Sequence, residues 1–287
     1  MPILSIVIPI YNERDVWRQL LRRVEAVDLS PLGVGRQIIL VNDASTDGTS
    51  EQLDEWWRGL SDESKTAQTV AWASRPCVSG ASCPRIVPGH EQDVPVTRER
   101  DALETHGRDA HATAAYTLIC HENNQGKGAA LRDGFAAATG DIVLIQDADL
   151  EYDPAEYPQL LSPILAGHAD VVYGSRFLGG RPKQIARANY LANRVLTFLS
   201  NRITGLKLTD METCYKVFRR DVLARITIEH DRFDVEPELT AKLAALGVRV
   251  TEVPIRYQGR SKNEGKKIGV RDGFAALRCI WRYRRRR

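Results

Sequence analysis

Two aspartates separated by one residue, Asp147 and Asp149, stand directly after an apolar run of the sequence. The run at residues 141–146 has the composition of a buried strand, so both carboxylates leave the end of that strand together. Two carboxylates this close repel each other unless they share a hard divalent cation, which prefers oxygen ligands. Glu151 adds a third oxygen. Asp147, Asp149 and Glu151 are therefore candidate ligands of Mg²⁺ or Mn²⁺, which would stabilise a departing diphosphate. Asp-x-Asp is also common in turns and helix starts, so the pattern by itself leaves a structural role open.

Polar side chains also follow three other predicted strands, at Glu13, Asp43 and His121. In a parallel α/β sheet the carboxyl ends of the strands meet along one edge, and ligands bind in the crevice outside that edge. We therefore expect these four strand ends to line one ligand-binding crevice.

Strand and helix patterns alternate along the chain and position these strand ends. The expected strands lie at residues 3–9, 38–41, 116–120, 141–146, 169–174 and 248–257. Helical spacing of apolar residues occupies residues 15–27, the region from about 49, and residues 129–138, 154–166, 184–203 and 237–246. This order predicts the α/β class, with a mostly parallel sheet and helices on both faces.

The alternation stops between about residues 59 and 115, where no hydrophobic period persists. A stretch this long without periodicity is unusual inside a compact domain, so we expect an irregular insert there. The chain of 287 residues with 43% hydrophobic content suits one large domain over residues 1–287. Its C-terminal segment, about residues 266–287, is basic and has apolar residues at helical spacing.

Composition excludes several classes of protein. The net charge of +3 is small and dispersed, which argues against a nucleic-acid-binding face. Five scattered cysteines favour a reducing compartment, so we expect a cytoplasmic chain. They lack the paired Cys-x-x-Cys spacing of a structural zinc site. The adjacent Cys120 and His121 do not form such a pair either. No apolar run approaches the roughly 20 residues that span a bilayer, so we expect any membrane contact to be peripheral.

Five motifs in fixed order resemble those of the family 2 glycosyltransferases with the GT-A fold. They lie at residues 5–13, 41–48, 123–134, 140–149 and 174–176. Within that family the chain most resembles the polyprenyl-phosphate sugar transferases typified by dolichyl-phosphate mannose synthase. The resemblance spans nearly everything outside the insert. It implies metal-dependent, inverting transfer of a sugar from a UDP- or GDP-linked donor to a lipid phosphate or another acceptor.

The resemblance also implies roles for individual residues. The implied donor-binding residues are Pro9, Tyr11, Glu13, Asp43, Asp147, Ala148, Asp149, Arg260 and Lys266. Asp43 would bind the uracil or guanine base, while Asp147 and Asp149 would hold the ribose and the metal diphosphate. Arg260 and Lys266 belong to a basic loop that would close over the diphosphate. Family members often carry glutamine where this chain has Glu151, which leaves the metal or nucleotide preference open.

The implied catalytic residues are Asp149, Arg176 and Glu236. Arg176 resembles the family arginine that faces a donor or acceptor phosphate. Glu236 or Asp234 would serve as the general base for a hydroxyl acceptor, whereas an anionic phosphate acceptor needs no strong base. The helix dipole alone also favours acids in a first helical turn, so a structural role stays open. Asp210 and Glu212 are further candidates for acceptor contacts.

Lys127 lies between two glycines at the start of an expected helix. Two interpretations are equally open at this position. Either the ammonium faces phosphate together with the backbone N–H groups of the helix start, or the glycines only shape the turn and Lys127 is solvated.

The apolar face at residues 184–203 and the basic segment at 266–287 also have two interpretations. They suit peripheral contact with the inner face of an anionic membrane, or they dock on the core.

The alternative functions are transfer to a soluble or cell-envelope hydroxyl acceptor, or a catalytically silent nucleotide-sugar-binding protein. A sugar nucleotidyltransferase would carry a glycine-rich basic loop after its first strand, where this chain has Tyr11, Asn12 and Glu13.

Overall fold

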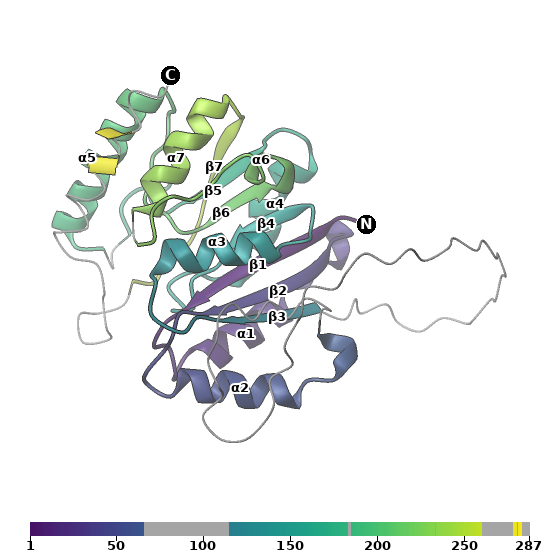
Figure 1. The fold of residues 1–287 in the computed structure, drawn as a ribbon. Coiled ribbons are helices and arrows are strands. Elements are labelled where there is room, and N and C mark those ends of the chain that lie inside the picture. Colours follow the sequence, from purple (N-terminus) through teal and green to yellow (C-terminus); the bar gives the residue numbers. More distant parts are fainter. Residues whose placement is uncertain (66–114, 183–184, 233, 260–277, 280, 283–287) are drawn as a thin grey trace, which may run out of the picture.

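The computed structural model describes residues 1–65, 115–182, 185–232, 234–259, 278–279 and 281–282. They form a seven-stranded sheet in the order β3-β2-β1-β4-β6-β5-β7, with helices packed on it (Figure 1). The strands are β1 (Ile3–Ile10), β2 (Gly35–Asn42), β3 (Ala115–Cys120), β4 (Ile142–Ile145), β5 (Val171–Ser175), β6 (Lys216–Arg219) and β7 (Val250–Pro254). The helices are α1 (Trp17–Ala26), α2 (Thr49–Gly59), α3 (Lys127–Ala137), α4 (Tyr157–Leu165), α5 (Arg187–Thr204), α6 (Arg220–Leu223) and α7 (Val235–Leu246). Short 3₁₀ turns are η1 (Ser30–Leu32), η2 (Asp62–Ser64) and η3 (Pro154–Glu156).

The expected mostly parallel sheet is confirmed. Neighbouring strands run parallel except at β6, which is antiparallel to both β4 and β5. The expected strands and helices are present, with ends shifted by a few residues. Strand β6 was not expected from the sequence, because four residues with an exposed Arg219 at their end give no readable period.

A hydrophobic core lies on each face of the sheet. Successive residues of β1, such as Ile6 and Val7, point to opposite faces and enter different cores. The core that contains Ile6 includes Trp17 and Leu20 of α1 and Leu160 of α4. The core that contains Val7 includes Ala130 and Leu131 of α3 and Leu239 of α7. Because β1 is buried on both faces, its sequence is apolar apart from Ser5, and the strand could therefore be predicted from the sequence.

The expected irregular insert at about residues 59–115 lies mostly outside the described residues. At its edges, α2 continues to Gly59, η2 follows, and β3 begins at Ala115. Of the basic segment at about 266–287, the structure describes four residues, and these are helical. The extent of the single domain therefore stays a prediction.

Helix α5 packs some of its large apolar side chains against the core, such as the partly buried Leu196 and Ile203, and exposes others. Its buried residues are the small polar Thr197, Ser200 and Thr204. In contrast, Leu191 and Phe198 are 64% and 66% exposed. The expectation that an apolar face of residues 184–203 docks on the core is therefore wrong for these two side chains. Among the described residues, no helix is both long and apolar enough to cross a membrane.

Candidate functional site

The backbone is left-handed at three adjoining strand ends. Asn12 follows β1, Ala44 follows β2 and Leu150 follows β4, with φ of 54°, 56° and 61°. Within the described residues, no other residue except glycine has a positive φ. Such backbone costs on the order of 1–3 kcal/mol per residue and is concentrated at functional sites. Since β2, β1 and β4 are neighbours in the sheet, the strained positions lie along one edge.

Side-chain hydrogen bonds hold the turns after β1 and β2 together. The N–H of Asn12 donates to Ser45 Oγ at 3.0 Å, and the N–H of Thr46 donates to Asn12 Oδ1 at 2.8 Å. The N–H of Glu13 donates to Thr49 Oγ1 at 3.1 Å, which places Glu13 beside the start of α2. These bonds fix the position of the backbone that carries three of the expected donor-binding residues.

Those three residues are not equally accessible. Pro9 lies within β1 opposite Val41, and Tyr11 is half-buried just beyond the strand. Glu13 is buried, with 9% of the residue exposed. The structure thus places Pro9, Tyr11 and Glu13 at the expected sheet edge.

The carboxylate of Asp43, at the end of β2, binds the turn before α3. Its Oδ1 accepts from the N–H of Gln125 at 2.8 Å, and its Oδ2 accepts from the N–H of Gly126 at 2.7 Å. His121 Nδ1 donates to the same Oδ1 at 2.7 Å. Burial by itself raises the pKa of Asp43, but these hydrogen bonds outweigh it and lower the pKa below its ordinary value.

His121 is a site residue whose role was not predicted from the sequence. Its side chain is fully buried, and its second nitrogen, Nε2, lies 2.9 Å from Asp133 Oδ2 of α3. Burial alone lowers the pKa of His121, but Asp43 and Asp133 outweigh it and raise the pKa. The signal in the sequence is its position directly after a strand, as for Asp43 and Asp147. That position indicates a site residue, but it does not reveal the two carboxylates.

Lys127 lies in an ion-pair cluster with only 12% of its side chain exposed, so the interpretation that it is solvated is wrong. Its Nζ lies 2.9 Å from Asp147 Oδ1 and 3.1 Å from Glu236 Oε1, and it also contacts Cys214 Sγ. Burial alone lowers the pKa of Lys127, but these neighbours raise it well above its ordinary value, so Lys127 is an ammonium ion. The cluster joins the start of α3 to the end of β4 and the first turn of α7.

The glycines on either side of Lys127 allow a close approach of another backbone segment. A Cβ on Gly128 would lie 2.0 Å from the carbonyl oxygen of His230, and one on Gly126 would lie 2.5 Å from that of Asp231. Gly126 also has φ of +100°, which other residues rarely adopt. Both glycines are therefore required for this packing.

The three expected metal ligands have different partners. Asp147 pairs with Lys127, Asp149 Oδ1 accepts from the N–H of Glu151 at 3.1 Å, and the Tyr257 hydroxyl donates to Glu151 Oε2 at 2.6 Å. Across the part of the chain that the structure describes, no group of three or more His, Cys, Asp or Glu side chains is arranged to hold a metal ion. The left-handed Leu150 turns the chain between Asp149 and Glu151. Asp147 and Asp149, at the same strand end, still offer the oxygen donors that Mg²⁺ and Mn²⁺ prefer. Ala148 between them is buried.

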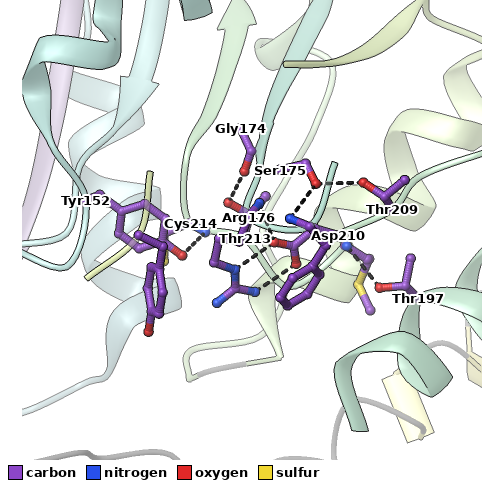
Figure 2. A network of polar contacts seen from close by, with 12 residues as sticks. Tyr152, Gly174, Ser175, Arg176, Thr197, Thr209, Asp210, Thr213 and Cys214 are labelled. Carbon is purple, nitrogen blue, oxygen red and sulfur yellow. Dashed lines mark hydrogen bonds and ion pairs between the residues drawn. The ribbon is translucent and has the colours of Figure 1, made fainter. Parts of the chain in front are cut away.

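Arg176, just after β5, is paired with Asp210. Figure 2 shows its guanidinium lying against that carboxylate, with Nε to Oδ2 at 2.6 Å and Nη2 to Oδ1 at 2.8 Å. The same network holds the loop that follows: the Thr213 hydroxyl donates to the Gly174 carbonyl, and the N–H of Cys214 donates to the Tyr152 hydroxyl (Figure 2). The Asp210 carboxylate is therefore committed to Arg176.

The loop before β6 also carries an acid, Glu212, with a buried carboxylate oxygen near Glu236 of α7. In the described part of the chain, Glu212 Oε1 is buried and has no hydrogen-bond partner. Burial and the nearby Glu236 raise the pKa of Glu212 to about 7. Cys214 is buried, and its thiol pKa is raised by burial, so it is not a reactive thiolate. Asp234 precedes α7 as expected. Arg260 and Lys266 lie outside the described residues.

Comparison with known proteins identifies the family. The sequence profile of Glycosyl transferase family 2 matches residues 5–65 and 110–227, which is more than half of the chain. The chain belongs to glycosyl transferase family 2. The expected resemblance is thereby confirmed, and the strand ends that carry the site lie within the matched residues.

Curated relatives of this family 2 member include transferases from archaea and bacteria. Glycosyltransferase AglJ of Haloferax volcanii is 29% identical over 175 residues, which are 60% of this chain and 57% of AglJ. An undecaprenyl-phosphate 4-deoxy-4-formamido-L-arabinose transferase of Klebsiella pneumoniae is 26% identical over 262 residues, covering 91% of this chain and 62% of that enzyme. The chain thus spans about 60% of the length of these two relatives.

A solved structure with the same fold is glucosyl-3-phosphoglycerate synthase from Mycobacterium tuberculosis, crystallised with Mn²⁺, UDP and phosphoglyceric acid. The TM-score is 0.60 at 16% sequence identity, over 99% of this chain and 79% of that one. The same enzyme has also been crystallised with Mg²⁺ and UDP. The expected GT-A fold of this family 2 member is confirmed.

Proposed function

We propose that the chain is a metal-dependent, inverting glycosyltransferase that moves a sugar from a UDP- or GDP-linked donor to a polyprenyl phosphate. The observation that carries this proposal is the position of Asp43, Asp147 and Asp149 at the carboxyl ends of β2 and β4, the two strands that flank β1 in the sheet. Of these, Asp147 pairs directly with the buried Lys127 ammonium. Family membership and the names of the curated relatives support it.

On the donor side, Asp43 contacts the base, and Pro9, Tyr11 and Glu13 line the nucleotide pocket. Asp147, Ala148 and Asp149 face the ribose and the diphosphate, with Arg260 and Lys266 as further diphosphate contacts. Mg²⁺ or Mn²⁺ would be held by Asp147 and Asp149, with Glu151 as a third ligand. When bound, the cation neutralises charge on the departing diphosphate.

On the acceptor side, a phosphate nucleophile is proposed because it is already anionic and needs no general base. The position of Glu236 supports this choice, since its carboxylate is occupied by an ion pair with Lys127 Nζ at 3.1 Å. The name of the Klebsiella relative includes undecaprenyl phosphate. Arg176 is proposed to face the acceptor or donor phosphate through guanidinium N–H groups that Asp210 leaves unused.

Transfer to a hydroxyl acceptor is the second candidate. It is favoured by the acids at the acceptor side, where Glu212 has a buried, unpaired oxygen in the described part of the chain. In that case Glu236 would act as the general base. A silent binding protein is disfavoured because Glu13, Asp147 and Asp149 are all retained.

A peripheral position at the inner face of the membrane is part of the proposal. Helix α5 exposes Leu191, Val195 and Phe198, which are 64%, 48% and 66% exposed, and it has three arginines and no acid. Apolar side chains flanked by cations suit an anionic bilayer surface, where a polyprenyl phosphate resides.

Transfer assays with two acceptors test the function. UDP- and GDP-linked radiolabelled sugars are supplied with Mn²⁺ and either undecaprenyl phosphate in vesicles or a soluble hydroxyl acceptor. The proposal predicts label in the lipid fraction with one donor, and loss of that label on Asp149→Asn. Label found only in the hydroxyl acceptor would show that the acceptor is a hydroxyl compound and not polyprenyl phosphate. Binding of a donor without any transfer would favour a catalytically silent binding protein.

A further inference from the structure

His121 connects three structural elements through its two ring nitrogens. The residue follows β3, Nδ1 donates to Asp43 at the end of β2, and Nε2 donates to Asp133 on α3. A neutral imidazole has only one N–H, so donating to both carboxylates requires the doubly protonated ring. The side chain is fully buried, so water does not replace either contact.

Asp43 in turn is held in a single orientation. Its carboxylate has about four acceptor positions, two on each oxygen. His121 and the N–H of Gln125 use both positions of Oδ1, and the N–H of Gly126 uses one position of Oδ2. One acceptor position on Oδ2 remains for a ligand. The His121 contact therefore decides which oxygen of Asp43 is presented.

The same contacts position the start of α3. The N–H groups of Gln125 and Gly126, which Asp43 binds, immediately precede Lys127, the first residue of α3. Lys127 is paired with Asp147 at 2.9 Å. A continuous chain of short contacts thus runs from His121 through Asp43 to the carboxylate pair after β4.

We propose that His121 is a positioning residue that orients Asp43 for recognition of the donor base and links that recognition to the placement of Lys127 beside Asp147. The inference rests on the proposed function and adds a specificity-determining residue to it. His121 itself does not contact the donor. Its effect on binding is through Asp43, so a change at His121 alters base preference and donor affinity more than the turnover of bound donor.

Two amide substitutions separate the two contacts of the ring. The amide nitrogen of asparagine reaches about as far as Nδ1 and keeps the donor to Asp43, whereas that of glutamine reaches as far as Nε2 and keeps the donor to Asp133. His121→Phe removes both donors and retains a ring. His230→Asn is the matched control, because His230 contacts Glu238 at 2.9 Å and not Asp43.

The test is calorimetric titration of the full chain with UDP and with GDP, each with Mn²⁺, and measurement of KM and kcat for the preferred donor. We expect His121→Asn and His230→Asn to bind within about threefold of the unsubstituted chain. We expect His121→Gln and His121→Phe to bind the preferred nucleotide at least tenfold more weakly, with a reduced preference between UDP and GDP. Their KM should rise more than their kcat falls.

Unchanged affinity and base preference in His121→Gln would overturn the inference, as would an equal loss in His121→Asn and His121→Gln, because the ring would then act only by packing. If His121→Phe does not fold, as judged by circular dichroism, the comparison of His121→Asn with His121→Gln alone tests the inference. Failure of the unsubstituted chain to bind either nucleotide would instead overturn the proposed function, and the inference with it.

Discussion

At Lys127, one buried ammonium neutralises carboxylates from two distant parts of the chain, Asp147 and Glu236. Because all three side chains are largely removed from water, removing any one of them leaves the charges of the others uncompensated. A glycine-lysine-glycine turn is common in sequences, and only the fold reveals that this lysine points inward. The partners come from positions 20 and 109 residues away, which no local pattern encodes.

Replacing Lys127 by methionine tests this cluster. We expect Lys127→Met to lower the free energy of unfolding by about 3–5 kcal/mol, because it leaves buried carboxylates uncompensated. The double variant Lys127→Met with Glu236→Gln should recover part of that loss. Urea denaturation measures both. A double variant that is less stable by the sum of the two single effects would contradict the ion-pair account.

The imidazolium of His121 makes stability depend on pH. The pKa of His121 is raised, so its contribution is complete below the unfolded-state value of about 6.5 and is lost as the pH rises through the folded-state pKa. The groups that face the ring are Asp43 and Asp133, and the lowered pKa of Asp43 keeps it ionised throughout this range.

We therefore expect the free energy of unfolding to fall more steeply above pH 6.5 in the unsubstituted chain than in His121→Asn, because only the histidine loses a proton over this range. Urea denaturation at a series of pH values, with identical buffers for both proteins, measures the difference. Parallel curves for the two proteins would show that His121 does not bind its extra proton in the folded state.

At the scale of elements, the start of α3 depends on glycine, because a side chain there would clash with the backbone before α7. The carbonyl oxygen of His230 lies only 2.0 Å from the position that a Cβ on Gly128 would take. This contact lets the segment before α7 pack against α3. A sequence pattern identifies the turn but not the segment that approaches it.

Gly128→Ala should lower the free energy of unfolding by about 1–3 kcal/mol or more, because backbone must move to admit the methyl group. Gly59→Ala is the matched control. Gly59 is the last residue of α2, and apart from its chain neighbours and the backbone of α2 no described atom lies within 4 Å of the place that an added methyl carbon would take, so we expect no loss of stability there. Thermal unfolding distinguishes the two, and an equal effect at both positions would refute the close approach.

Helix α5 provides a second test at this scale. The double variant Leu191→Ser with Phe198→Ser should reduce binding to anionic vesicles at least tenfold, because burying each of these side chains is worth about 1.5–3 kcal/mol. Its stability should change little, since both positions are exposed. Asn189→Ser, at an exposed polar position of α5, is the control. Unchanged flotation of the double variant with vesicles would exclude α5 from membrane contact.

At the scale of the whole molecule, the α/β order and the strand-end site were predictable from sequence. Strands buried on both faces are continuous apolar runs, and parallel strands bring their carboxyl ends to one edge. Sequence-based prediction failed for features that are determined by contacts between residues far apart in the chain. Strand β6 is too short to show a period, and α5 buries small polar residues while the more hydrophobic Leu191 and Phe198 stay exposed.

The charge pairs of the site were equally beyond sequence reasoning. Arg176 was expected at a phosphate, and the fold places Asp210 against its guanidinium. His121 was visible as a polar residue at a strand end, but its carboxylates belong to the end of β2 and to α3. Residue type and strand position thus indicated the candidate site, whereas the partner of each charge required the fold.

The central claim is that the carboxylates after β4 serve transfer from a nucleoside diphosphate sugar. Its most direct test is the rate of UDP or GDP release from the matching sugar donor, with Mn²⁺ and undecaprenyl phosphate present, in the unsubstituted chain and in Asp149→Asn. Removing one charge-stabilising group from such a site typically costs about 10²–10³ in rate. We predict acceptor-dependent release that falls roughly a hundredfold or more in Asp149→Asn. Equal rates in the two proteins, or no release with either donor, would contradict the account.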